Sequence, residues 1–294
     1  MIPKQLVQEL RYIEIYTRRA VRDHRIGDYR SPLRGRGFEF DQHQRYQHGD
    51  DYRQIDWNAT ARMHQPYVKK AFQERELSAV IIADLSRSME FASMDQSKHE
   101  LLLRVAATLA FSATSDNMQV GLLGFTDRIE LDLPLKKGSA QMWKILESLW
   151  DVKPTSIRTD FSLPFNYLLT RLKTSTLLFL ISDFIQVEET FHSHALRHLA
   201  RRHDLIPVII EDPWEECLPG GRGFLRLHDA ETGGKMVLNL TGTKKNLYRS
   251  MMQERRGALE RALYNLNLDH LFLHSEKPYL DPVIGFFLAR KRRK

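Results

Sequence analysis

Four short runs of almost purely apolar residues limit what this chain can fold into. They are SAVIIA at 78–83, VGLLGF at 120–125, TLLFLI at 176–181 and LIPVII at 205–210. Each run has the length of one β-strand, and none alternates as a strand with one wet face does. Strands that are apolar on both faces and alternate with helices form a parallel sheet covered on both sides. We therefore predict an α/β fold with a doubly wound, mostly parallel sheet and helices on both faces.

Local patterns predict the other elements of this domain. Alternating residues at 129–133 indicate a short antiparallel edge strand, and 224–227 with 235–240 indicate a β-hairpin that turns at Gly233-Gly234. We expect helices at 98–112, 140–150, 161–172, 188–202 and 247–266, then a strand at 270–274 and a short final helix.

The first 76 residues have a different texture. Apolar positions at three-to-four spacing predict an amphipathic helix over 3–25. Glycines, prolines, aromatics and alternating charges then indicate short strands and turns, including a half-buried strand at 67–72. We divide the chain into an amino-terminal helix with a small β/turn segment at 1–76, the α/β domain at 77–289 and a basic tail at 290–294.

Charge and composition argue against several classes of protein. The net charge is +7, but the surplus lies in residues 1–40 and 290–294, which is more typical of a solvated tail than of a nucleic-acid-binding face. The single cysteine, Cys217, rules out an intramolecular disulfide and a cysteine-based zinc site. No apolar run approaches the roughly 20 residues of a membrane span. We expect a cytoplasmic protein with at most peripheral membrane contact and no specific nucleic-acid binding.

Polar oxygens follow two of the apolar runs. The sequence DLSRS at 84–88 comes directly after the first run, and Asp183 follows the run that ends at 181. Thr159 lies in a loop before the helix expected at 161. Residues just beyond the carboxyl ends of central strands line the crevice where a doubly wound sheet binds ligands. We therefore expect five residues to meet at one rim: Asp84, Ser86, Ser88, Thr159 and Asp183.

Two carboxylates and three hydroxyls suit a hard cation, Mg²⁺ first, with Mn²⁺ or Ca²⁺ as alternatives. We predict the three hydroxyls as direct ligands and the two carboxylates as direct or water-bridged ligands. Neutral hydroxyls leave the ion incompletely neutralised, with an open position that an Asp or Glu of a partner protein can fill. Ordinary loop roles stay open as well: Thr159 could cap the following helix, and Asp183 could be a simple strand-end residue.

The ordered set DLSRS, Thr159 and ISDF resembles the von Willebrand factor A-type fold with its metal-ion-dependent adhesion site. The segment GRGFEFDQHQRYQHGDDYRQIDWNATAR at 35–62 resembles the signature of the bacterial domain-of-unknown-function-fifty-eight family, as do DPWEECLP and ETGGK. The resemblance implies a metal-dependent adaptor that acts with MoxR-type AAA+ ATPases in the assembly or maturation of other proteins. Many family members carry transmembrane helices ahead of the signature, whereas this chain starts with the amphipathic helix.

Charges of both signs surround Trp57 within this signature. The charged residues are Asp50, Asp51, Arg53, Asp56 and Arg62. They could form an ion-pair network that fastens the segment to the sheet, or, with Trp57, a docking surface for the ATPase.

The sequence thus predicts a non-enzymatic, metal-dependent protein-interaction module, with two alternatives. A metal-dependent hydrolase would use the same cation to activate water, and it needs a general base for which the sequence offers no evident candidate. Peripheral membrane or nucleic-acid binding would act through the basic termini. A phosphate-binding loop of the ATPase type is absent from the sequence, so ATP hydrolysis is not indicated.

Overall fold

The computed structural model describes residues 40–46, 52, 55–63, 65–71, 77–185, 190–191, 193–221, 223–228 and 234–293. They belong to two compact units, a larger one within 77–293 and a smaller one within 40–71, which we treat separately. The predicted helix at 3–25 lies outside the described residues, and so do Asp50, Asp51 and Arg53.

A six-stranded sheet forms the centre of the larger unit as far as it is described. Its strands are β3 (Ser78–Asp84), β4 (Gln119–Phe125), β5 (Ile129–Lys136), β6 (Leu177–Ser182), β7 (Asp204–Glu211) and β10 (Leu271–His274). They lie in the order β10-β7-β6-β3-β4-β5, and β5 is antiparallel to its neighbour while the other pairs are parallel. The four apolar runs are the four inner strands, and nearly all of their residues are buried. The predicted α/β fold with a mostly parallel sheet is confirmed.

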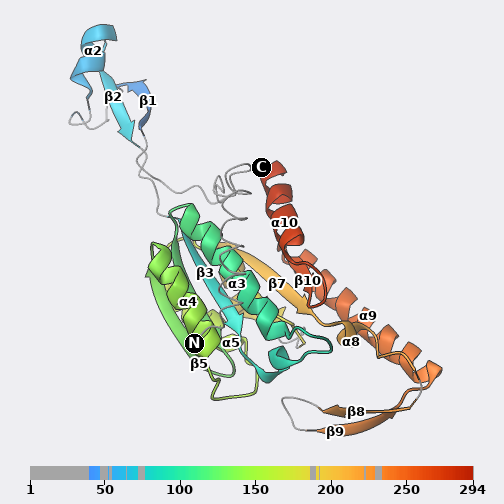
Figure 1. The fold of residues 1–294 in the computed structure, drawn as a ribbon. Helices are drawn as coiled ribbons and strands as arrows, with labels where there is room; N and C mark the ends of the chain where they lie inside the picture. The colour runs from blue at the N-terminus through green and yellow to red at the C-terminus, as the bar shows by residue number, and fades with distance from the viewer. Residues whose placement is uncertain are drawn as a thin grey trace. The chain divides into compact units, whose positions relative to one another are not determined.

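Helices cover both faces of this sheet (Figure 1). One face packs against α3 (Lys98–Ser115), α4 (Ser139–Asp151) and α10 (Leu280–Arg292), and the other against α5 (Ser162–Arg171), α7 (His194–Arg202) and α9 (Gly242–Asn265). Successive side chains of a strand point to opposite faces, so Ile81 enters one hydrophobic core and Ile82 the other. Two continuous cores therefore hold the sheet between its helical layers.

The chain order creates a switch point between β3 and β6. From β3 the chain passes to β4 on one side of it, then crosses over to β6 on the other side. Connections that leave in opposite directions open a crevice at the carboxyl ends of the two strands. Asp84 ends β3 and Asp183 follows β6, so both residues lie at this crevice.

The predicted hairpin is present as β8 (Phe224–His228) and β9 (Lys235–Asn239), and Gly233 of its turn lies outside the described residues. Figure 1 shows the hairpin apart from the main sheet, next to the start of α9. The helix predicted at 188–202 is interrupted. Thr190 and Phe191 are helical, Ser193 is extended with φ −60° and ψ 129°, and α7 begins after it.

The last residues also differ from the prediction of a solvated tail. The helix α10 continues to Arg292, and Arg290 is buried within it. Arg290 Nη2 lies 2.9 Å from Asp204 Oδ1, and Arg290 Nε lies 2.7 Å from Asp269 Oδ2. Arg290 therefore stabilises the folded domain through its ion pairs and is not part of a solvated tail. None of the described helices combines the length and apolar composition that crossing a membrane requires.

The smaller unit pairs β1 (Phe40–Arg45) with β2 (Tyr67–Ala71) in antiparallel fashion, and α2 (Trp57–Met63) lies between them in the chain. Asp56 caps α2, because its Oδ1 accepts hydrogen bonds from the backbone amides of Asn58 (3.0 Å) and Ala59 (3.2 Å). Trp57 is 70% exposed and Arg62 is exposed. Of the signature residues, Asp56 thus has a local structural role, while the side chains of Trp57 and Arg62 are exposed to solvent.

Candidate metal centre

Asp84 joins the two strands of the switch point. Its carboxyl group is buried, and its Oδ2 accepts a hydrogen bond of 2.6 Å from Ser182 Oγ at the end of β6. Its Oδ1 accepts a hydrogen bond of 2.9 Å from the backbone amide of Ser86. The second bond turns the chain back over the strand end, as Asp side chains do in Asx turns. The carboxylate therefore holds the loop 84–88 at the rim of the sheet.

Two hydroxyl groups of this loop lie side by side. Ser86 Oγ and Ser88 Oγ are 3.1 Å apart, and both residues are buried. Oxygens bind Mg²⁺ at about 2.1 Å, so neighbouring ligands of an octahedral ion lie about 3.0 Å apart. The two hydroxyls therefore have the spacing of adjacent ligands on one hard cation. Asp84, Ser86 and Ser88 come together as the sequence predicted.

The loop that carries Thr159 is attached to the same rim. The backbone amide of Arg87 donates to the carbonyl of Ile157 (3.3 Å), and the amide of Asp160 donates to the carbonyl of Thr126 (3.1 Å). Thr159 is half-buried between these two anchors. At the start of α5 it is Asp160 Oδ1 that accepts a hydrogen bond, from the Ser162 amide at 2.8 Å.

Asp183 has a partner that sequence analysis missed. Lys98, the first residue of α3, is fully buried, and its Nζ lies 2.6 Å from Asp183 Oδ2. The same ammonium also binds Glu215 Oε1. The other oxygen of Asp183 accepts from the backbone amide of Ile185 at 3.3 Å. Asp183 is thus already paired with a buried ammonium, whereas the oxygens of Asp84 accept from a hydroxyl and a backbone amide. This difference favours an indirect role for Asp183, by charge or through water, over direct coordination of a cation.

The turn DPWE presents Glu215 to Lys98. Residues Pro213–Glu216 form the short helix α8, and Asp212 caps it by accepting from the Trp214 amide at 2.9 Å. The Asp212 amide donates to Glu215 Oε2 at 3.3 Å, which completes a capping box and leaves Oε1 for Lys98. The turn at 212–215 therefore holds the carboxylate that pairs with Lys98 beside the candidate metal centre.

The buried negative charge at this rim is not fully compensated by positive charge. Burial raises the pKa of Asp84 to about 7, and the nearby charge of Asp183 raises it further, while hydrogen bonds from Ser182 and Ser86 lower it. Burial lowers the pKa of Lys98, but Asp183 and Glu215 raise it by more, so the ammonium stays charged. A divalent cation beside Asp84 would compensate the buried carboxylate. The donor set and its electrostatics therefore fit a hard cation.

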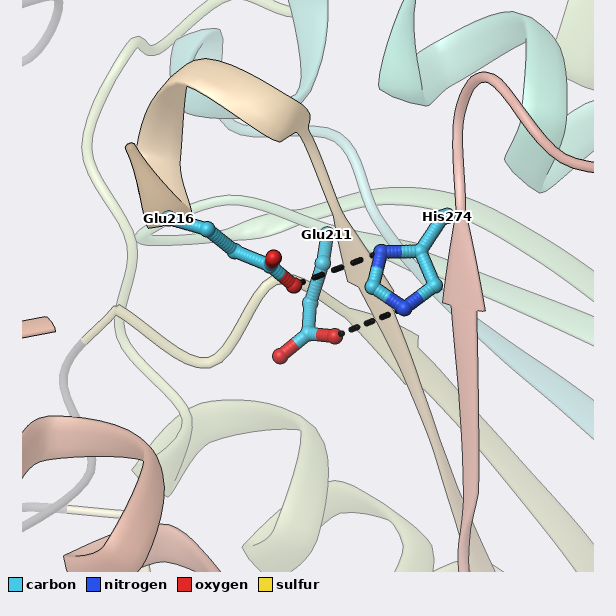
Figure 2. Close-up of side chains that lie close together, drawn as sticks. All are labelled: Glu211, Glu216 and His274. Atoms are coloured by element: carbon cyan, nitrogen blue, oxygen red, sulfur yellow. Dashed lines mark ion pairs between the residues drawn. The ribbon is translucent and has the colours of Figure 1, made fainter. Parts of the chain in front are cut away.

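A second cluster of ionisable side chains lies nearby, and Figure 2 shows one ring nitrogen of His274 facing Glu211 and the other facing Glu216. His274 Nε2 lies 3.6 Å from Glu211 Oε2, and His274 Nδ1 lies 3.4 Å from Glu216 Oε1. Arg256 Nη1 contacts the same two glutamate oxygens at 2.9 and 3.2 Å. Because the carboxylates face different ring nitrogens and already share a guanidinium, we interpret the cluster as an ion-pair network between β7, α8, α9 and β10.

The sequence profile of the family described as "Protein of unknown function DUF58" matches residues 42–258. The chain belongs to the DUF58 family. This confirms the family resemblance, and the match covers residues 42–62 of the signature segment. Uncharacterized proteins of Mycobacterium bovis and Mycobacterium tuberculosis are 24% identical to this DUF58 protein over 290 residues, which cover 98% of this chain and 90% of each relative.

A solved structure shares the fold of this DUF58 protein. BatB, a conserved hypothetical protein of Bacteroides thetaiotaomicron, is 16% identical, with a TM-score of 0.50 over 74% of this chain and 100% of that chain. Because the family is described as one of unknown function, a function for this DUF58 protein has to be argued from its own site.

Replacing Lys98 by Met tests the buried ion pairs. Removal of one partner from such a group leaves uncompensated buried charge and costs about 3–5 kcal/mol. We expect the free energy of unfolding, measured by urea denaturation, to fall by that amount in Lys98→Met. Lys144→Met, which changes an exposed lysine of α4, is the control and should change it by less than about 0.5 kcal/mol. Equal stability of the two variants would contradict the pairing.

The raised pKa of Asp84 predicts how stability depends on pH without metal. The folded-state pKa of about 7 lies above the ordinary value of 3.8, so the folded protein binds the proton more tightly. Stability should therefore fall as pH rises between these values, by up to about 1.4 kcal/mol per pH unit. Between about pH 5 and pH 7, thermal unfolding of Asp84→Asn in EDTA should show a shallower slope than wild type. Glu211 titrates in both proteins, because burial also raises its pKa to about 7. Parallel slopes would refute the assignment to Asp84.

Proposed function

We propose that this protein is a non-enzymatic, Mg²⁺-dependent protein-interaction module with a von Willebrand factor A-type metal site. In this proposal Ser86, Ser88 and Thr159 bind the cation directly, Asp84 binds it directly or through water, and Asp183 acts through water or by its charge. An Asp or Glu of a partner protein completes the coordination. The observation that carries the proposal is the pair of buried hydroxyls 3.1 Å apart beside a buried carboxylate at the switch point.

The charge distribution supports binding of an acidic partner. Lys98 pairs with Asp183 and Glu215 and offsets one of their two negative charges. Of the two carboxylates proposed to act on the cation, Asp84 is therefore the one that does not pair with the ammonium. A divalent ion with one carboxylate and neutral hydroxyls keeps positive charge. Such an ion attracts a further carboxylate more strongly than a fully neutralised one would.

The same pairing argues against hydrolysis. A hydrolytic mechanism needs a general base close to the cation. At this rim Asp183 and Glu215 both bind the Lys98 ammonium, so neither carboxylate is free to turn toward a water on the cation. We therefore propose recognition as the function of the site.

We also propose that the partner is a MoxR-type AAA+ ATPase, or a protein that such an ATPase assembles, in the cytoplasm. The support is the family resemblance of the sequence, together with the exposed Trp57 and Arg62 on α2 of the smaller unit. Exposed aromatic and arginine side chains are enriched where proteins bind one another.

Titration with metal tests whether the protein binds a cation through these residues. We expect isothermal titration calorimetry to detect Mg²⁺ or Mn²⁺ binding by the wild type, and Ser86→Ala and Asp84→Ala to weaken it by roughly tenfold or more because each loses an oxygen donor. The control Ser162→Ala removes an exposed hydroxyl at the start of α5 and should bind like wild type. Circular dichroism establishes that each variant is folded. Undiminished binding by folded Asp84→Ala, or no binding by the wild type, would contradict the proposal.

A further inference from the structure

A pocket of about 420 Å³ adjoins the candidate metal centre. Its lining includes Asp183 and Glu215 of the candidate metal centre and several residues of α9. Met252, Arg255, Arg256 and Leu259 follow one another there at the spacing of a single helix face, so this pocket wall is one stripe of α9. The pocket and the metal centre therefore share a boundary.

Arg256 already has partners within the pocket wall. It pairs with Glu211 and Glu216, and its guanidinium lies 4.5 Å from the centre of the Phe272 ring. These contacts hold the guanidinium against Glu211, Glu216 and Phe272. Arg256 is thus committed to the structure of the wall.

Arg255 and Arg249 are differently placed. Arg255 is half-buried, and its Nη2 contacts the backbone carbonyl of Asp183 at 3.5 Å. Arg249 is exposed, and its Nη2 lies 3.1 Å from Cys217 Sγ. In the part of the chain that the structure describes, neither guanidinium has a carboxylate within ion-pair distance. A guanidinium has five N–H donors in a fork that fits a carboxylate, so both retain donors for a ligand.

A bound cation would reverse the sign of the net charge around the pocket. The described carboxylates of the metal centre and the pocket are Asp84, Asp183, Glu211, Glu215 and Glu216. The described cationic groups are Lys98, Arg249, Arg255 and Arg256. With all nine groups ionised, five carboxylates against four cationic groups leave one negative charge, and a divalent ion turns it into one positive charge. An acidic ligand is therefore favoured when the cation is bound.

We propose that this pocket receives a second carboxylate from the same acidic partner segment whose first carboxylate completes the coordination of the cation. Arg255 pairs with the second carboxylate inside the pocket, and Arg249 attracts it at the mouth. The inference rests on the proposed function and specifies its partner as a peptide segment with two acidic residues close in sequence. Asp183 connects the two anchors, since its side chain belongs to the metal centre and its carbonyl contacts Arg255.

Selection from a display library of random peptides tests this inference with the full-length protein. In Mg²⁺, wild type should enrich peptides that contain two neighbouring acidic residues, and EDTA should release them. Fluorescence polarisation with the most enriched peptide should show roughly tenfold weaker binding to Arg255→Gln, because a paired charge loses its partner. Arg249→Gln should bind more weakly than wild type as well. Arg261→Gln, on an exposed part of α9 away from the pocket lining, is the matched control and should bind like wild type.

Substitutions in the peptide distinguish the carboxylate that binds the cation from the carboxylate that pairs with Arg255. Replacing either acidic residue by its amide should weaken binding to wild type, and one of the two replacements should have no further effect on Arg255→Gln. If binding depends on Mg²⁺ but needs only one acidic residue of the peptide, the proposed contact with Arg255 is overturned. The proposed metal site is not affected by that result. Equal binding in Mg²⁺ and EDTA would overturn the proposed function and, with it, this inference. A library that yields no binder, with all proteins folded by thermal unfolding, would overturn the inference as well.

Discussion

The Lys98 ammonium and its two carboxylate partners are the contact on which the rest of this site depends. Asp84 and Asp183 are buried at the carboxyl ends of neighbouring strands, and Glu215 approaches them from α8. Buried carboxylates are costly unless positive charge compensates them. Lys98 pairs with Asp183 and Glu215 and offsets one of their two negative charges, while Asp84 does not pair with this ammonium. A divalent cation is the natural counter-charge for the negative charge that remains. The division of charge explains why one site contains both a buried lysine and the donor set of a hard cation.

The same contact connects distant parts of the chain. Glu215 is held by the capping box of Asp212, and Asp212 Oδ2 also accepts hydrogen bonds from the Ser93 amide (3.0 Å) and Ser275 Oγ (3.3 Å). The loop after β3, the turn after β7 and the end of β10 are therefore tied together behind the rim. A ligand that contacts the cation and α9 would meet a preorganised surface rather than separate mobile loops.

The sequence predicted the sheet and part of the site because their signals are local. Inner strands are buried on both faces and read as unbroken apolar runs, and the polar residues that follow such a run must emerge at its carboxyl end. Lys98 and Glu215 were not predicted, because they lie 117 positions apart and their pairing depends on how α3 and α8 meet. A lysine in the first turn of a helix is unfavourable to the helix dipole, and this was the one local sign of a buried partner. Arg290 was misjudged as tail for a similar reason, since its partners Asp204 and Asp269 are brought to it only by the folded chain.

The most direct test of a cation at the switch point is a crystal structure of the protein soaked in Mn²⁺, with anomalous scattering to locate the ion. We predict one anomalous peak at roughly 2.1 Å from both Ser86 Oγ and Ser88 Oγ, with Asp84 bound directly or through water. Lys98 should remain paired with Asp183 in that structure. A peak between Glu211, Glu216 and His274 with none beside Ser86, or no peak at all, would contradict the account.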